Sequence, residues 1–148
     1  MSKDKKPKTK INPSTKKQPK LASPPTSFHN MKPSWRISGI EMVEPYGWQA
    51  LDANMLLYIK DKLTSFESMT WAEILVQGKK FHHTVAVVSL SQEAQSHLRE
   101  INLDDVDELV SLRLSAKERV WGILDQGVLS LLWWDPEHQV CPSLLRHT

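Results

Sequence analysis

The residues best suited to chemistry lie near the end of the chain, in the segment RVWGILDQGVLSLLWWDPEHQVCPS, residues 119–143. Arg119 opens one predicted strand, and His138 follows the end of the next one. Because antiparallel pairing brings these two ends of a hairpin together, we expect both residues to flank one site. A guanidinium can hold a phosphate and stabilise the charge of a transition state, and an imidazole can move a proton near neutral pH. The pair therefore suits metal-independent cleavage of a phosphodiester.

Glu137 precedes the histidine and is a candidate for a general base or for the group that orients His138. A structural interpretation of the same segment is open as well. In that interpretation a turn begins at Asp135, His138 is a surface residue, and Arg119 pairs with a nearby acid such as Glu118 or Asp135. The spacing of the residues does not separate the two interpretations.

A second set of residues suits contacts with RNA. Arg113 and Lys117 supply positive charge ahead of the hairpin, and Trp134 offers an indole on which a base can stack. Trp133 and Trp134 are neighbours on a predicted strand and must face opposite sides, so we expect one to be buried and the other partly exposed. Both indoles can equally be core residues, and an exposed one can mark a protein interface.

Histidine and cysteine side chains also permit a zinc set, made of His82, His83, His138 and Cys141. Adjacent histidines on a strand point to opposite faces, however, and the H-x-x-C pattern lacks a matching second pair. We therefore predict no metal site and no other cofactor. Cys141 is a weaker candidate for a nucleophile, because its position beside Pro142 suggests a structural role.

Helical patterns dominate the first half of the predicted domain. Apolar residues recur at helical spacing over residues 48–63, which predicts an amphipathic helix. Thr70 and Glu73 match a capping box that opens a short second helix. Ser91 can cap a third helix over residues 91–101. The buried stripe of this third helix is expected to consist of Ala94, Leu98 and Ile101.

Four short segments are typical of strands: residues 84–90, 109–114, 119–124 and 128–134. Gly127 can take the left-handed position of a three-residue hairpin loop between the last two. The last segment is apolar on both faces, as expected for a strand covered on both sides. We therefore predict an α+β fold, with N-terminal helices and a small antiparallel sheet that ends in a three-strand meander.

Composition divides the 148 residues into a basic tail and a mildly acidic body. Residues 1–34 carry nine lysines, one acidic residue and six of the nine prolines, which predicts a disordered tail. Such a tail can concentrate the protein on RNA or ribosomes, or it can merely keep the protein in solution. Residues 35–148 carry ten Lys and Arg against sixteen Asp and Glu, and we predict that they form a single compact α+β domain.

Several classes of protein are disfavoured by the sequence. No apolar run approaches the length of a membrane-spanning helix, and the N-terminal lysines are not followed by the apolar stretch of a secretory signal. The single cysteine excludes an internal disulfide and suits a reducing compartment. We therefore expect a cytoplasmic protein with no membrane partner.

The stretch SLRLSAKERVWGILDQGVLSLLWWDPEHQVCPS resembles a group of small, mostly uncharacterised prokaryotic proteins. The order of strand, helix and three antiparallel strands over residues 84–143 also resembles the RelE/YoeB-like toxin superfamily. In that superfamily a YRVVY-like strand supplies a catalytic arginine, which Arg119 matches, and a basic or histidine-containing end follows the next strand, close to His138. The resemblance implies a toxin that cleaves RNA, acts on ribosome-bound message and is neutralised by a cognate antitoxin protein.

Two further functions compete with this expectation. The acidic body favours a non-catalytic protein-interaction module, such as an adaptor, an immunity protein or an antitoxin-type partner, that uses a tryptophan-rich sheet face. A weaker alternative is a nucleic-acid binder whose affinity comes from the lysine tail alone.

Overall fold

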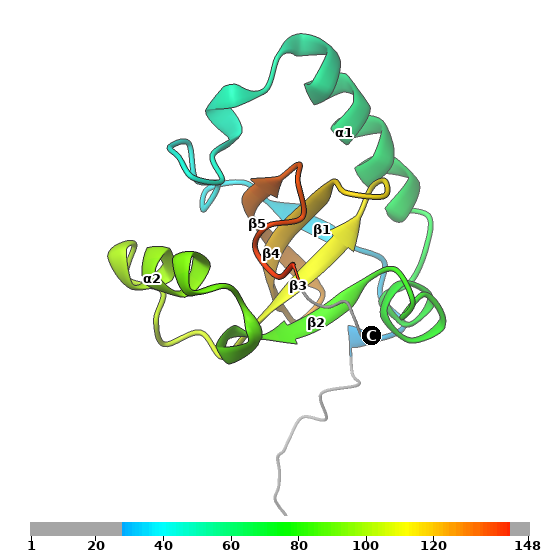
Figure 1. Cartoon of the computed structure of the whole chain (residues 1–148). Coiled ribbons are helices and arrows are strands. Elements are labelled where there is room, and N and C mark those ends of the chain that lie inside the picture. Colours follow the sequence, from blue (N-terminus) through cyan, green and yellow to red (C-terminus); the bar gives the residue numbers. More distant parts are fainter. Residues whose placement is uncertain (1–27, 143–148) are drawn as a thin grey trace, which may run out of the picture.

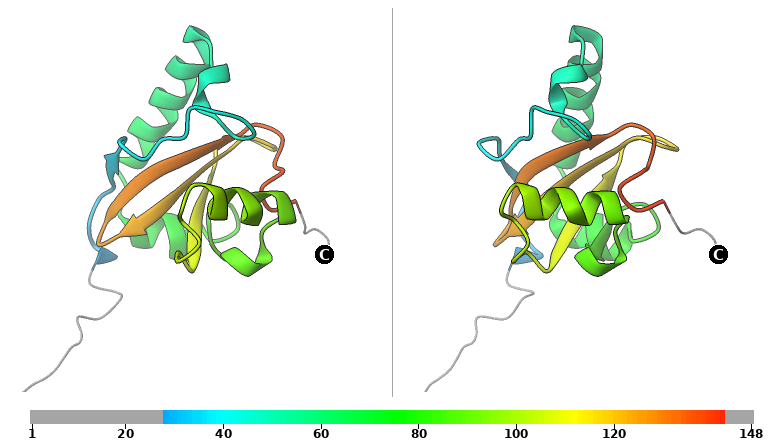
Figure 2. Two further views of the ribbon diagram at one scale, coloured as in Figure 1. Left: turned by 90° about the vertical axis from the view of Figure 1, so that its left-hand side faces the viewer. Right: turned by 60° about the vertical axis from the view of Figure 1, so that its left-hand side comes forward.

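A computed structural model describes residues 28–142 as a five-stranded sheet with an α-helix against each face (Figures 1 and 2). The predicted α+β class is confirmed. The spatial order of the strands is β1-β5-β4-β3-β2. Their bounds are β1 Ser34–Arg36, β2 His83–Ala86, β3 Glu108–Arg113, β4 Arg119–Asp125 and β5 Val128–Asp135.

The predicted three-strand meander is present, since β3, β4 and β5 pair antiparallel in chain order. The turn between β4 and β5 is one residue shorter than predicted, because Asp125 pairs directly with Val128. Gln126 and Gly127 both have positive φ angles, 51° and 88°. Positive φ at both central residues is the geometry of the two-residue turns that match the twist of paired strands.

The sheet is mixed rather than wholly antiparallel, which corrects the prediction. The difference is β1, a three-residue strand that the sequence did not indicate and that runs parallel to β5. At the opposite edge, β2 is shorter than the predicted strand over 84–90 because Val87–Ser89 forms a short 3₁₀ turn. The apolar last strand, β5, is internal as expected, with β1 on one side and β4 on the other.

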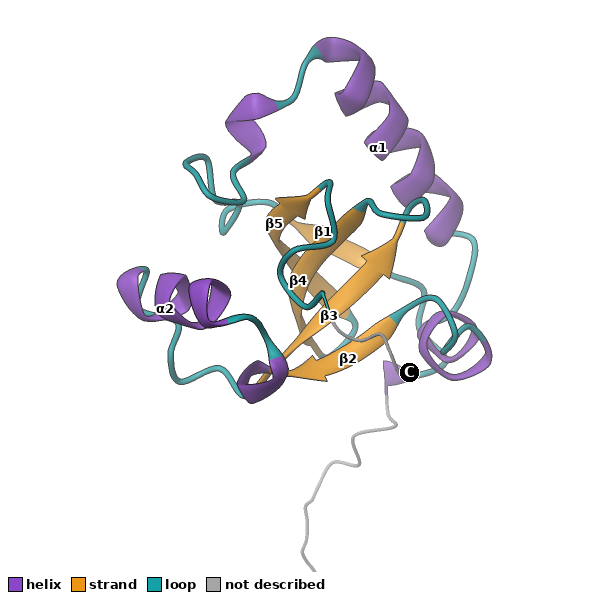
Figure 3. Cartoon of the chain, viewed as in Figure 1, coloured by secondary structure: helices purple, strands orange, loops and turns teal. Residues whose placement is uncertain are grey.

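Two α-helices lie on opposite faces of the sheet, α1 (Ala53–Phe66) and α2 (Gln92–Glu100) (Figure 3). The helix predicted over 48–63 begins later, because the side chain of Asp52 accepts a 2.8 Å hydrogen bond from the amide of Met55 and caps α1 there. Ser91 caps α2 in the same way, as predicted. The predicted capping box is also confirmed: Thr70 and Glu73 exchange both of its hydrogen bonds at the start of a helical turn.

Each face of the sheet has its own core. On the α1 side, apolar residues of the sheet pack against the buried stripe of the helix, and the main members are Val110, Leu112, Val120, Leu129, Trp134, Ile59, Leu63 and Phe66. On the α2 side the main members are Leu109, Trp121, Trp133, Ala94 and Leu98, with Ile101 partly buried against them. The two faces thus separate Trp133 from Trp134 as the strand alternation requires.

The folded domain begins before residue 35. The carbonyls of His29 and Met31 accept hydrogen bonds of 2.9 Å from the amides of Ala72 and Trp71. Residues 28–34, which the composition assigned to the tail, therefore belong to the domain, whereas the predicted tail over 1–27 lies outside the described residues. Within the described part of the chain, none of the helices has the length and apolar character needed to span a bilayer.

Candidate functional site

A pocket of about 290 Å³ lies on the α2 face of the sheet, between the β2 edge and the loop that follows β5. Arg119 and His138 both line it, so the structure brings together the two residues that the hairpin argument placed at one site. The other lining residues are His83, Val85, Ser111, Trp121 and Cys141. Arg119 is the one charged side chain among these lining residues and can attract an anion, while the buried carboxylate of Asp135 behind the wall partly offsets its charge.

Arg119 is the first residue of β4 and is only 7% exposed. Its Nη1 atom donates to the carbonyls of Ser115, Ala116 and Glu118, at 2.9, 3.2 and 3.2 Å. These bonds fix the side chain to the backbone of the β3–β4 loop, and none of them goes to the carboxylate of Glu118 or of Asp135. One edge of the guanidinium is therefore structural, and the remaining donors are available to a ligand in the pocket.

His138 reaches the pocket because the loop after β5 is tied back to the sheet. Asp135, which is 1% exposed, accepts hydrogen bonds from the amides of Gln139 and Val140, at 2.8 and 3.0 Å. His138 lies inside this loop with a left-handed φ of 57°. The predicted turn at Asp135 is thus present, and it directs the histidine toward the pocket instead of leaving it at a distant surface.

The surroundings of the two pocket histidines favour the neutral form of each ring. Burial lowers the pKa of His138, and the nearby Arg119 lowers it further while Asp135 opposes the shift. Burial and Arg119 lower the pKa of His83 as well. A neutral imidazole is the form that accepts a proton, so each ring can act as a general base.

His83 is the functional candidate that the sequence did not single out as part of this site. It lies on β2 opposite Ser111, which in turn pairs with Trp121 on β4. The neighbouring His82 takes the other side of the strand, where its ring packs against Phe66 at 5.0 Å. The two adjacent histidines therefore have separate environments, as strand alternation predicts.

The zinc set that the sequence permits, and that we did not predict to form, does not assemble. Three of its residues, His83, His138 and Cys141, line the pocket, but His82 lies on the opposite face of β2. Among residues 28–142, no group of three or more His, Cys, Asp or Glu is placed to hold a metal ion. Burial raises the pKa of the Cys141 thiol, and its Sγ lies 3.4 Å from the carbonyl of Ser89. A protonated, hydrogen-bonded thiol is a poor nucleophile.

Three of the other predicted site residues are not among those that line the pocket. The carboxylate of Glu137 is exposed and forms a 3.0 Å ion pair with Lys117, so it does not orient His138 in this structure. Lys117 is held in this ion pair on the exposed surface. The guanidinium of Arg113 lies 5.4 Å from the centre of the Phe81 ring, and its Nε donates to the carbonyl of Ser115.

The prediction that Trp134 stacks an RNA base is wrong for this structure. Trp134 is 4% exposed and packs in the α1-side core, while Trp133 on the other face is fully buried. Because a helix covers each side of the sheet, neither indole of the pair is left partly exposed. The tryptophan-rich sheet face is consequently not a free surface.

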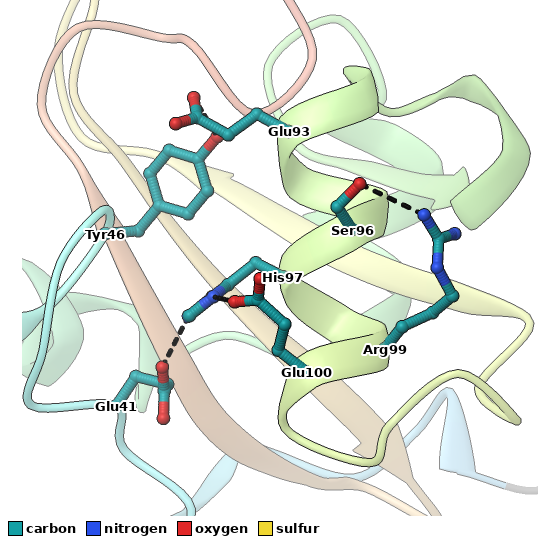
Figure 4. Close-up of polar contacts among 7 residues, drawn as sticks. All are labelled: Glu41, Tyr46, Glu93, Ser96, His97, Arg99 and Glu100. Carbon is teal, nitrogen blue, oxygen red and sulfur yellow. Dashed lines mark hydrogen bonds and ion pairs between the residues drawn. The ribbon is translucent and has the colours of Figure 1, made fainter.

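A second polar cluster lies at α2 and was not predicted (Figure 4). His97 is 7% exposed, and its Nε2 and Nδ1 atoms lie 2.6 Å from Glu41 and 3.1 Å from Glu100. Tyr46, beside this ring, donates its hydroxyl to Glu93 at 3.3 Å, and burial raises the pKa of Tyr46 to about 12. These contacts join α2 to the segment before α1, so the cluster is structural.

The pocket thus combines one buried arginine, two neutral imidazoles and a serine hydroxyl from three strands and a loop. This set can bind an anion and transfer protons to and from it. Comparison of the chain with protein-family models, curated proteins and solved structures gives no match.

Proposed function

We propose that this protein is a RelE-like toxin, a metal-independent endoribonuclease of the cytoplasm that a cognate antitoxin protein neutralises. The observation that supports the proposal is the shared pocket of Arg119 and His138, with no carboxylate among its lining residues. An RNA phosphodiester is the substrate whose chemistry uses both the arginine and the histidine of this pocket. It carries the negative charge that a guanidinium binds, and its 2′-hydroxyl supplies the nucleophile from within the substrate.

In the proposed reaction the neutral imidazole of His138 removes the proton of the 2′-hydroxyl. The 2′-oxygen then attacks the adjacent phosphorus, and the bond to the 5′-oxygen breaks. The products are a 2′,3′-cyclic phosphate and a free 5′-hydroxyl end. The donors of Arg119 that face the pocket stabilise the additional negative charge on the phosphoryl oxygens.

Positive charge outside the pocket supports binding of the rest of the RNA, or of the ribosome. Residues 1–34 carry nine of the chain's nineteen lysines and arginines. Arg113 follows the pocket residue Ser111 on the same strand and faces the same side as Arg119, its register partner. Phosphate contacts of this kind are sensitive to salt, so the proposed affinity for RNA falls as ionic strength rises.

The first experiment is growth of a bacterial host after tightly controlled expression. The set comprises the wild type, His138→Gln, Arg119→Lys and the control His29→Gln, whose ring packs on Phe28 away from the pocket. We expect arrest by the wild type and the control, and relief by both pocket substitutions. A harmless wild type at verified soluble levels, or arrest that both pocket variants retain, would contradict the proposal.

A non-catalytic interaction module is the second candidate, and an apolar groove of about 410 Å³ favours it. The groove lies between β1, α1 and the segment that joins them, and Ile37 and Leu56 in its wall are 71% and 50% exposed. β1 is the last strand at this side of the sheet, so its outer edge can pair with an added strand. An extended apolar segment of a partner protein fits both features.

Leu56→Glu separates this second candidate from the first. The substitution places a charge in the groove and leaves the RNA pocket on the other face untouched. If the protein acts as a module, a partner identified by mass spectrometry binds the wild type and His138→Gln but not Leu56→Glu. If the growth arrest depends on His138 and not on Leu56, the enzymatic proposal is favoured.

A further inference from the structure

His83 and His138 line the same pocket and come from two different elements. His83 comes from the edge strand β2, whereas His138 comes from the loop that follows β5. Ser111 and Trp121 line the pocket as well, and the strand register places both in one row with His83. Arg119 is two residues before Trp121 on the same face of β4. The arginine therefore lies on the same face of the sheet as His83 and lines the pocket together with both imidazoles.

The two rings also share one electrostatic environment. Arg119 lowers the pKa of both His83 and His138, and His83 adds to the lowering of the pKa of His138. A bound phosphate opposes this lowering of the two pKa values, because its negative charge offsets that of the guanidinium. Binding of the substrate thus favours protonation of one imidazole while the other stays neutral. Such a pair provides one acid and one base at the same pH.

We infer that His83 is the second catalytic residue of the pocket and acts as the general acid toward the 5′-oxygen. This inference rests on the proposed ribonuclease function. While His138 takes the proton of the 2′-hydroxyl, protonated His83 gives its proton to the 5′-oxygen as the phosphorus–oxygen bond breaks. One proton is gained by His138 and one is lost by His83, so the reaction consumes no cofactor and no metal. Exchange of a proton with water restores both rings.

The other lining residues are less suited to this role. Ser111 is 3% exposed, and the pKa of a serine hydroxyl is too high for an acid that works near neutral pH. The Cys141 thiol faces the carbonyl of Ser89. His83, in contrast, lies on an edge strand and is partly covered at the pocket, while the residue as a whole stays exposed. Because it packs in neither core, its replacement is compatible with folding.

A substrate with a better leaving group tests the inference directly. The full chain is assayed on an RNA oligonucleotide with one scissile linkage, and on the same oligonucleotide with sulfur in place of the bridging 5′-oxygen. Thiolate leaves without a proton, so the sulfur substrate does not need a general acid. We expect His83→Gln to lose about 10²- to 10⁴-fold in rate on the oxygen substrate and to regain most of it on the sulfur substrate. His138→Gln is expected to be slow on both.

The pH dependence of the rate provides a readout that a structural role would not change. Wild type is expected to give a bell-shaped profile, and His83→Gln is expected to lose the falling limb at high pH. His82→Gln is the matched control, because this neighbouring ring lies on the other face of β2. Equal rates of His83→Gln and wild type on the oxygen substrate would overturn the inference, as would loss on both substrates with a well-folded variant.

Failure of the inference and failure of the proposed function give different results. If wild type cleaves neither free RNA nor ribosome-bound message, the ribonuclease proposal fails and the role of His83 fails with it. If wild type cleaves and His83→Gln cleaves equally well, only the inference about His83 fails. A titration with an uncleavable 2′-deoxy oligonucleotide adds a test without turnover: the imidazole NMR signals of His83 and His138 should shift, and that of His29 should not.

Discussion

Trp121 donates its indole N–H to the buried carboxylate of Asp135, at 3.1 Å from Nε1 to Oδ2. The same carboxylate accepts the amides of Gln139 and Val140, so one side chain joins β4 to the loop that carries His138. Asp135 is also the register partner of Arg119 on β4. This one residue therefore fixes the relative position of the arginine and the histidine of the pocket without lining the pocket itself.

Asp135→Asn is expected to lower the free energy of unfolding by about 2–4 kcal/mol, because an amide cannot accept all three of these donors in a buried site. Chemical denaturation followed by tryptophan fluorescence measures the change. The exposed Asp105 provides the matched control, and Asp105→Asn is expected to change stability by less than about 0.5 kcal/mol. Equal unfolding midpoints for Asp135→Asn and wild type would show that the carboxylate does not hold the loop.

The contacts of His97 provide a second stability test. Glu41 is 18% exposed at its contact with His97, whereas Glu100 is 72% exposed. A double-mutant cycle of His97→Ala with Glu41→Gln is expected to give a coupling energy of about 1–2 kcal/mol, and the cycle with Glu100→Gln about 0–0.5 kcal/mol. Urea denaturation of the single and double variants measures both values. A larger coupling energy in the cycle with Glu100 would mean that the exposed His97–Glu100 contact holds α2 more strongly than the His97–Glu41 contact does.

Acid is expected to destabilise the domain through His82. Burial, helped by His83, Arg119 and Arg113, lowers the pKa of His82 from 6.5 to about 4. Between these values the unfolded chain binds the proton and the folded chain does not, so stability is fully present above about pH 6.5 and is lost as the pH falls toward 4. At pH 5 the loss from this ring is about 1–2 kcal/mol, allowing for its partial exposure.

Urea denaturation at pH 7.5 and pH 5.0 measures this loss. His82→Gln is expected to show a smaller fall in the free energy of unfolding between pH 7.5 and pH 5.0. His29→Gln should show the same fall as the wild type. The remaining fall in His82→Gln has a physical source, because the pKa values of His83 and His138 are lowered in the same direction. Equal stability of the domain at pH 7.5 and pH 5.0 would contradict a neutral, half-buried His82 in the folded state.

The meander was predictable because its signals are local. Short runs of apolar, β-branched and aromatic residues define β3 and β4, and a turn-forming pair separates β4 from β5. The expectation that Arg119 and His138 lie at one site followed from that hairpin alone. β1 was not predictable, since three residues after a proline carry little pattern, and their partner strand lies more than ninety positions further along the chain, at Ser34↔Val128. A similar long-range contact, between Glu41 and His97, explains why the histidine of α2 is buried.

The role of His83 depends on register, which sequence periodicity leaves open. His83 faces the pocket because it pairs with Ser111. A shift of β2 by one residue would place His82 there instead, since successive side chains of a strand alternate between the two faces. The burial of Trp134 depends on a different tertiary feature, the packing of α1 on its side of the sheet. In both cases the missing information was the position of a distant element.

Close approach of two backbones at Gly122 provides the last prediction. β4 and β5 shift register between Trp121 and Gly122, and at this irregularity a Cβ on Gly122 would lie 2.6 Å from the carbonyl oxygen of Ser130. Because the contact is with backbone, relief requires the two central strands to move apart. Gly122→Ala is therefore expected to lower the free energy of unfolding by more than about 2 kcal/mol. Gly39→Ala is the control, since its nearest contact would be 3.8 Å. Thermal unfolding of both variants measures the difference, and equal midpoints would mean that the strands yield at this position.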